Sequence, residues 1–191
     1  MRNAAVILAA GTSTRFGARK QDVRIDGRRM VDIIAATAAE AGLDPVLAVI
    51  PPGFDVAPAV TRVVNERPEA GISRSLRLGV DALPEQVDAA VILLGDEPLV
   101  DAGILRRLAA AGDRGAKVVA ARSGDRIGPP VLLRREAFGL VHRATGDHGL
   151  RELLRGIRGL VTVALPQPPL DVDTQADLDT LLTLRRDRRD R

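Results

Sequence analysis

The chain has 191 residues, 46% of them hydrophobic and 28% charged, which is the size and composition of one folded domain with a full hydrophobic core. It contains no cysteine and two histidines, which excludes disulfides and a cysteine nucleophile and leaves little for a His-rich metal site or a Ser-His-Asp triad. The net charge of +3 is modest, and three phenylalanines without Trp or Tyr are too few to stack the bases of single-stranded nucleic acid.

The two ends of the chain predict a soluble, single-domain protein. The N-terminal apolar stretch is interrupted at Gly11 without a cleavage pattern, and no apolar run is long enough to span a membrane. Residues 185–191 carry much of the positive charge, as is typical of a solvated, frayed terminus. We therefore expect a cytoplasmic protein with one domain over residues 1–184, a charged tail over 185–191, and neither a nucleic-acid nor a membrane partner.

Short apolar runs alternate along the chain with segments of helical periodicity. Strands are predicted at residues 4–8, 46–50, 62–65, 91–94, 117–121, 130–133 and 161–165. Helices are predicted at residues 30–41, 73–83, 104–111, 136–143, 149–155 and 175–185. This alternation predicts a three-layer α/β/α fold with a mainly parallel, Rossmann-like sheet, in which ligands bind beyond the carboxyl ends of the strands.

The loop after the first strand has the composition of a phosphate-binding loop. Residues 8–20 are rich in Ala, Gly, Ser and Thr, and such small residues let backbone N–H groups approach a polyphosphate closely. Arg15 and Lys20 add positive charge. The loop is not a P-loop, because Gln21 follows the lysine, and it lacks the G-x-G-x-x-G of dinucleotide-binding loops. At this point an ordinary glycine turn with solvent-facing arginines stays open.

Carboxylates occur at two further places where a ligand is expected. Asp96 is the second residue after the most apolar predicted strand, so its side chain can project beyond the sheet edge and suits Mg²⁺. Asp171 and Asp173 would lie on one face of an extended strand and could address one cation. Capping of the following helices, by Asp96 in one place and by Asp173 or Thr174 in the other, is the structural alternative.

These motifs, in this order, resemble those of the MobA-like NTP transferases, within the wider GT-A-type nucleotidyltransferases. The Ala-Ala-Gly opening and Lys-Gln ending of loop 8–21 are most similar to the molybdenum cofactor cytidylyltransferases, whereas the guanylyltransferases typically have Ala-Gly-Gly and an Asp before the lysine. The resemblance implies that this loop wraps the triphosphate and contacts the base. The residues that take those roles are Leu8, Ala9, Ala10, Gly11, Arg15 and Lys20, with Arg15, Lys20 and Asp96 as the catalytic set.

The resemblance also implies a metal site and a nucleoside site. Residues 94–99 resemble the family's Gly-Asp-Gln-Pro-Leu element, with Glu97 in place of Gln, which implies that Asp96 holds the catalytic Mg²⁺. Residues 171–178 resemble the Asp-x-Asp-Thr-Pro-Glu-Asp-Leu ending, which favours Asp173 as the second metal ligand, with Asp171 in reserve. The candidates beside the base and ribose are Asn65, Gly71, Ser73 and Ser75, with N-capping as the alternative for Ser73.

The acceptor side is less clearly marked. Residues 128–132 and 145–149 resemble the family's acceptor-side elements, but Pro129 stands where the family usually has His, so the acceptor is not identified. Asp147 has a better claim to a functional role than its neighbour His148.

The resemblance implies a Mg²⁺-dependent nucleotidyltransferase that transfers a nucleoside monophosphate from an NTP, with CTP favoured, to a phosphorylated small molecule such as molybdopterin, and releases pyrophosphate. A guanylyltransferase using GTP, or a relative with another acceptor, stays open. A nicotinamide-dependent oxidoreductase is a rival from another class, against which the missing G-x-G-x-x-G counts. A non-catalytic nucleotide-binding protein is a second rival, against which Lys20, Asp96 and Asp173 count. The sequence predicts no oligomeric state.

Overall fold

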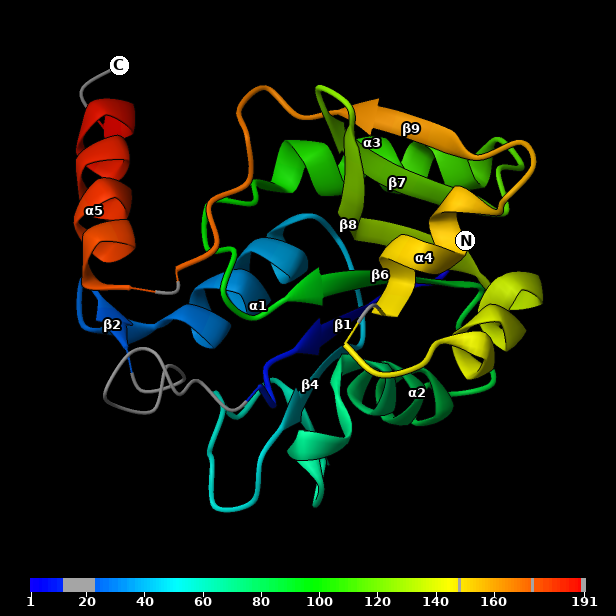
Figure 1. Ribbon diagram of the computed structural model, residues 1–191, viewed down its shortest axis with the longest axis horizontal. Helices are drawn as coiled ribbons and strands as arrows, with labels where there is room; N and C mark the ends of the chain where they lie inside the picture. The colour runs from blue at the N-terminus through cyan, green and yellow to red at the C-terminus, as the bar shows by residue number, and fades with distance from the viewer. Residues whose placement is uncertain (12–22, 148, 173, 190–191) are drawn as a thin grey trace.

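The structure is a computed structural model that describes residues 1–11, 23–147, 149–172 and 174–189 (Figure 1). The strands are β1 (Asn3–Leu8), β2 (Arg24–Ile25), β3 (Arg28–Arg29), β4 (Val46–Ile50), β5 (Thr61–Val64), β6 (Ala89–Leu94), β7 (Val118–Ser123), β8 (Arg126–Arg134) and β9 (Val161–Ala164). The helices are α1 (Met30–Glu40), α2 (Ile72–Asp81), α3 (Ala102–Asp113), α4 (Gly149–Arg155) and α5 (Gln175–Arg189), with 3₁₀ turns η2 (Pro68–Ala70) and η3 (Arg135–Arg143).

Within these ranges a seven-stranded sheet has the order β5-β4-β1-β6-β8-β7-β9. The pairs β5/β4, β4/β1, β1/β6 and β7/β9 are parallel, and β8 runs antiparallel to both of its neighbours. The predicted mainly parallel α/β sheet is therefore confirmed. The β2–β3 hairpin was not predicted, since two-residue strands rich in arginine carry no apolar alternation.

Helices cover both faces of the sheet, which gives the three layers that the sequence predicts. The side chains of α1 and α3 pack on one face, and those of α2, η3 and α4 pack on the other. In Figure 1, α3 lies behind the strands and α4 in front of them. The approach of α2 is close because it has a glycine at the contact: a Cβ at Gly79 would lie 2.4 Å from Cγ1 of Val6. Both faces of the central strands are therefore buried, which explains their continuous apolar sequence.

A third, smaller apolar cluster joins α5 to α1. It contains Met30 and Ile33 from α1, Leu181 from α5, and Val172 from the segment between β9 and α5. The predicted cap of α5 is confirmed as a capping box: the Asp177 backbone N–H donates to Thr174 Oγ1 (3.2 Å), and the Thr174 N–H donates to Asp177 Oδ2 (2.7 Å). In the described ranges, no helix has the length and apolar character needed to cross a membrane.

Candidate active site

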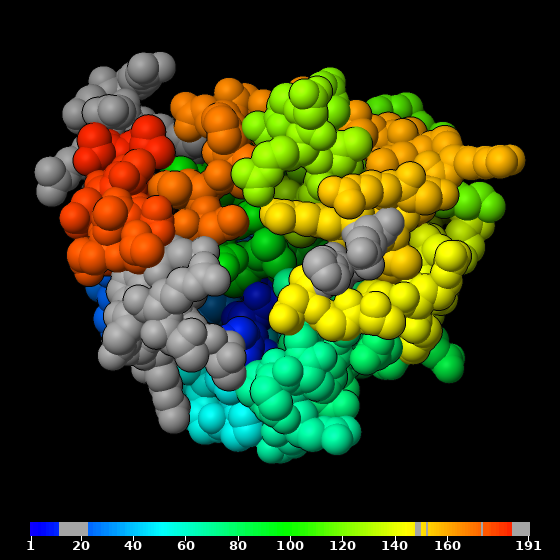
Figure 2. Space-filling view, viewed as in Figure 1, coloured from blue at the N-terminus to red at the C-terminus, as the bar shows by residue number. Residues whose placement is uncertain are grey.

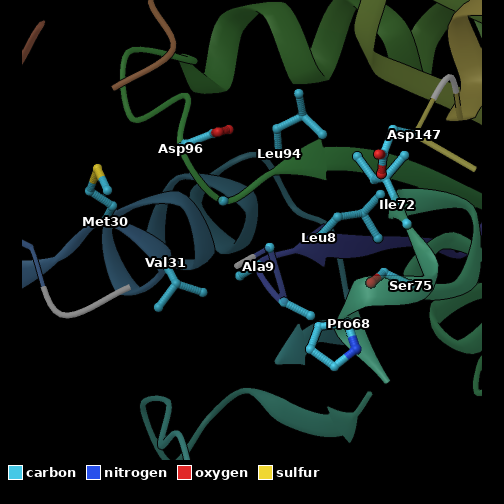
Figure 3. Close-up of a pocket in the computed structure, with 14 residues that line it drawn as sticks. Leu8, Ala9, Met30, Val31, Pro68, Ile72, Ser75, Leu94, Asp96 and Asp147 are labelled. Atoms are coloured by element: carbon cyan, nitrogen blue, oxygen red, sulfur yellow. The ribbon is translucent and has the colours of Figure 1, made fainter. Parts of the chain in front are cut away.

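A cavity of about 350 Å³ opens at the carboxyl ends of β1 and β6, where the sequence predicts the ligand site. Figure 2 shows the hollow in the middle of this face, with the blue N-terminal strand at its floor. In Figure 3, Asp96 and Asp147 lie on different sides of the cavity, with Leu8 and Ala9 between them. The lining residues are Leu8, Ala9, Ala10, Gly11, Met30, Val31, Pro68, Gly71, Ile72, Ser75, Leu94, Gly95, Asp96 and Asp147.

The floor of the cavity depends on a close contact between the ends of β1 and β6. The Gly95 N–H donates to the Leu8 carbonyl at 2.9 Å, and the Ala9 N–H donates to the Val49 carbonyl at 2.8 Å. A Cβ at Gly95 would lie 2.7 Å from the Cβ of Ala9, so the two chain segments can approach only because residue 95 is glycine. This contact brings the start of the predicted phosphate loop beside Asp96.

A buried hydrogen-bond network lies behind one side of the cavity. Asn65 Oδ1 accepts from the Arg67 backbone N–H and from Arg74 Nε, both at 3.0 Å. Both partners can only donate, so this side of the amide must be the oxygen, and its nitrogen faces Ser75. Asn65 Nδ2 then donates to Ser75 Oγ at 3.0 Å, which leaves the Ser75 hydroxyl proton to be donated elsewhere. Because Ser75 lines the cavity, a ligand there is one acceptor that this proton can reach.

The start of α2 is joined to the predicted acceptor-side loop. Gly71, the N-cap of α2, has φ +89° and ψ 169°, and its missing Cβ would lie 2.7 Å from the carbonyl carbon and oxygen of Gly146. The Ser73 N–H donates to the Gly146 carbonyl (3.1 Å), and Arg77 Nη1 donates to the Ala144 carbonyl (2.8 Å). These bonds hold Asp147 at the cavity. We call Asn65, Gly71, Ser75 and Gly146 the α2 wall.

Asp96 lines the other side of the cavity, and Glu97 and Asp171, which interact with one another, lie behind it. We call these three carboxyl groups the acidic wall. Glu97 is 6% exposed, and burial together with the charges of Asp171 and Asp96 raises its pKa from 4.5 to about 9. Arg151 opposes this shift. A hydrogen bond between the Glu97 and Asp171 side chains acts in the same direction as burial, because a protonated Glu97 can donate to the Asp171 carboxylate.

The acidic wall is held against the last segment before α5. The Val172 backbone N–H donates to the Asp96 carbonyl at 3.1 Å. The motif that contains Asp96 therefore lies beside the motif that contains Asp171. The expectation that Asp171 belongs to a strand is wrong, since residues 170–172 have irregular backbone, anchored by this hydrogen bond. Capping by Asp96 is also wrong, because Asp101 caps α3 by accepting from the Ile104 N–H at 2.9 Å.

The structure brings together most of the predicted site residues that it describes. Those that line the cavity are Leu8, Ala9, Ala10, Gly11, Gly71, Ser75 and Asp96. Asn65 and Ser73 are fully buried and do not line it, and Ser73 does not cap α2, whose N-cap is Gly71. Arg15, Lys20, His148 and Asp173 lie outside the described residues, so their predicted roles stay predictions.

Five apolar lining residues were missed by sequence reasoning: Met30, Val31, Pro68, Ile72 and Leu94. Three of them could have been predicted from the sequence, because Pro68 and Ile72 lie near Gly71 in the predicted nucleoside segment and Leu94 ends a predicted strand. Met30 and Val31 gave no such signal, since an apolar first turn of a helix is typical of core packing.

The donor set on the acidic wall suits a divalent cation. Oδ1 of Asp171 is buried and has no hydrogen-bond partner in the described part of the chain. Carboxylate oxygens are the ligands that Mg²⁺ and Mn²⁺ take, and a cation would satisfy such an oxygen. In the part of the chain that the structure describes, no group of three or more His, Asp or Glu side chains is placed to hold a metal ion.

Comparison with known proteins agrees with this geometry. Residues 5–163 match the MobA-like NTP transferase domain. The bifunctional protein GlmU of Clavibacter sepedonicus is 36% identical over 118 residues, which cover 56% of this chain and 24% of GlmU. The chain thus spans about a quarter of the length of such curated relatives.

Solved structures show the same fold over the whole length. Rv0371c of Mycobacterium tuberculosis H37Rv superposes with a TM-score of 0.84 at 28% identity, covering 96% of this chain and 98% of that one. A complex of Rv0371c with manganese superposes with a TM-score of 0.81 at 28% identity, covering 96% and 99%. The predicted family and fold are confirmed: this chain belongs to the MobA-like NTP transferase domain family, whose enzyme class is nucleotidyltransferase.

Proposed function

We propose that this protein transfers a nucleoside monophosphate from an NTP to a phosphorylated small molecule and releases pyrophosphate. The observation that carries the proposal is the cavity itself, which joins the start of the phosphate loop, the α2 wall and Asp96 at one edge of the sheet. CTP is the favoured donor, because the Ala-Ala-Gly opening of the loop resembles that of the molybdenum cofactor cytidylyltransferases. Molybdopterin is the acceptor that the same resemblance suggests.

In this reaction an oxygen of the acceptor phosphate attacks the α-phosphorus, and the bond from that phosphorus to the oxygen bridging to the β-phosphorus breaks. Pyrophosphate leaves with the electron pair. The attacking oxygen is already anionic, so alignment and charge neutralisation matter more than a general base. This agrees with a cavity whose described lining contains neither Cys nor His.

We divide the proposed roles between nucleotide binding, at the α2 wall and the first loop, and metal binding, at the acidic wall. The Ser75 hydroxyl, oriented by Asn65, donates to the nucleoside, and Arg15, Lys20 and the amides of the first loop hold the triphosphate. Asp96 and Asp173 hold Mg²⁺, with Asp171 as a further carboxylate beside them. The bound cation supplies neutralisation of the charge that develops on the phosphates.

The test is isothermal titration of the protein with CTP, GTP, ATP, UTP and NADH, each with and without Mg²⁺. We expect Mg²⁺-dependent binding of one NTP, and the NTP that binds identifies the base. GTP binding in place of CTP would assign the chain to the guanylyltransferase alternative. NADH binding without metal, or no NTP binding, contradicts the proposal.

Variants of the acidic wall make the same test specific to the metal. Asp96→Ala should weaken Mg²⁺-dependent NTP binding and lower pyrophosphate release at least about a hundredfold. Asp113→Ala, which removes an exposed carboxylate at the end of α3, is the matched control and should leave both unchanged. Asp171→Ala and Asp173→Ala, compared for Mn²⁺ affinity, show which aspartate is the second ligand.

A further inference from the structure

A second cavity, of about 240 Å³, lies between α4 and the hairpin that joins β7 to β8. We call it the arginine groove. It is lined by Asp125, Arg126 and Ile127 from the hairpin and by Arg151, Leu154 and Arg155 from α4. The lining therefore contains three arginines, one aspartate and two apolar residues. None of these residues lines the central cavity.

The three arginines are available to a ligand. Arg126, Arg151 and Arg155 are exposed, and none of their side chains makes a hydrogen bond or ion pair with a described residue. Some arginines elsewhere are paired: Arg29 pairs with Asp32 at 2.6 Å, and Arg106 donates to the Glu40 carbonyl at 2.7 Å. Holding several like charges in one groove without internal partners is unfavourable, and an anion would relieve the repulsion.

The helix α4 gives the groove its geometry. Arg151 and Arg155 are four residues apart, so they lie on the same face of the helix, one turn from each other. A guanidinium is always charged and presents its N–H donors in a planar fork that matches phosphate or carboxylate oxygens. The ligand class that this groove suits is therefore a phosphate or carboxylate group with an apolar neighbour.

The groove borders the acidic wall of the central cavity. Arg151 lies over Gly128 of β8, with Nε 3.5 Å from the position of a Cβ there, and its charge acts on Glu97. The loop that carries Asp147 of the central cavity runs directly into α4. In Figure 2 the light-green tip of the β7–β8 hairpin and the yellow-orange α4 lie side by side along the rim of the central hollow.

We propose that the arginine groove binds a second anionic group of the acceptor, separate from the phosphate that is attacked. This inference rests on the proposed nucleotidyl transfer. It predicts an acceptor with at least two anionic groups, one directed to the central cavity and one held by Arg126, Arg151 and Arg155. The groove then selects the acceptor, while the α2 wall and the first loop select the nucleotide.

The first experiment locates anion binding without turnover. Inorganic phosphate is titrated into ¹⁵N-labelled protein, and the amide signals of Arg126, Ile127, Gly128 and Arg155 are followed by NMR. These signals should shift in the wild-type protein. In the double variant Arg151→Gln/Arg155→Gln, phosphate affinity at these signals should fall about a hundredfold, or about tenfold for each guanidinium removed. Arg114→Gln/Arg134→Gln, with the same change in charge outside the groove, should behave as wild type.

The second experiment joins the groove to the central cavity. Glucose 1,6-bisphosphate should bind at least about tenfold more tightly than glucose 1-phosphate and should shift signals of both Asp147 and Gly128. Equal affinity for the two sugars, or groove signals that do not respond to phosphate, overturns the inference. If an NTP binds with Mg²⁺ while the groove does not respond, only this inference fails. If the groove responds but no NTP binds, it is the proposed nucleotidyl transfer that fails.

Discussion

The two walls of the central cavity are stabilised in different ways. On the α2 wall, the Asn65 side chain makes three hydrogen bonds with described residues. Gly71 has no side chain, which allows the Gly146 backbone to pack directly against it. On the acidic wall, burial and like charge hold Glu97 protonated, and an oxygen of Asp171 has no described partner. Of the described polar groups on the α2 wall, the Ser75 hydroxyl proton is the one left for a ligand, whereas on the acidic wall a cation would satisfy the buried Asp171 oxygen.

The largest effect should come from Glu97→Gln on the acidic wall. In the folded protein the Glu97 pKa is raised from 4.5 to about 9, so between these values the folded state holds a proton that the unfolded state has released. Stability without metal should then fall as pH rises through this window, by about 1.4 kcal/mol per pH unit and up to about 6 kcal/mol in all. Glu97→Gln should remove this slope in urea unfolding at pH 5–9 with EDTA.

The control for this prediction is Glu85→Gln, which makes the same chemical change at an exposed position. It should keep the wild-type dependence on pH. Equal slopes for the wild-type protein and Glu97→Gln would show that Glu97 ionises in the folded state as freely as in the unfolded chain. The acidic wall would then be no less stable than the α2 wall.

Gly71→Ala should be the most damaging change on the α2 wall. The backbone at φ +89° and ψ 169° is a region that only glycine adopts readily, and the new Cβ would overlap the Gly146 backbone at 2.7 Å. Strain and overlap together predict a loss of about 4 kcal/mol in the free energy of unfolding. Gly139→Ala, where a Cβ meets nothing within 4 Å, is the matched control for thermal unfolding and should change stability little.

Asn65→Ala should cost about 3 kcal/mol, because it leaves the Arg67 backbone N–H and a guanidinium N–H of Arg74, both part-buried, without their acceptor. Asn65→Asp sharpens the test, since it keeps the acceptor oxygen for Arg67 and Arg74 and replaces the donor to Ser75 by a charged oxygen that accepts the Ser75 hydroxyl proton. This variant should lose less stability than Asn65→Ala in urea unfolding yet bind the NTP more weakly in calorimetry. Equal NTP affinity for Asn65→Asp and wild type would mean that the Ser75 hydroxyl does not contact the nucleotide.

The smallest effect should be at the capping box that follows the acidic wall. Thr174→Ala removes the oxygen that accepts from the Asp177 N–H and should lower the free energy of unfolding by about 1 kcal/mol. Thr180→Ala, in the same helix, removes a hydroxyl that donates to the Ala176 carbonyl and should be neutral within about 0.5 kcal/mol. If Thr174→Ala also leaves the free energy of unfolding unchanged, the N-terminal cap of α5 does not help to anchor the acidic wall.

The sequence by itself determined the fold class, because apolar runs such as those of β1 and β6 have no other stable place than the middle of a covered sheet. It also indicated where the cavity lies, since the parallel strands end at one edge and their following residues meet there, as Asp96 does. Leu8, Gly71 and Ser75 were predicted through the resemblance of their motifs to those of the family, and they line the cavity.

Only the tertiary structure decided what each residue does there. Ser73 and Ser75 were predicted as equivalent hydrogen-bonding candidates, but only Ser75 lines the cavity. The raised pKa of Glu97 depends on the burial of its side chain and on Asp171, which is distant in sequence. The arginine groove likewise joins two separate segments. Sequence pattern records which residues follow one another, whereas burial, charge coupling and shared cavities arise only when distant segments pack together.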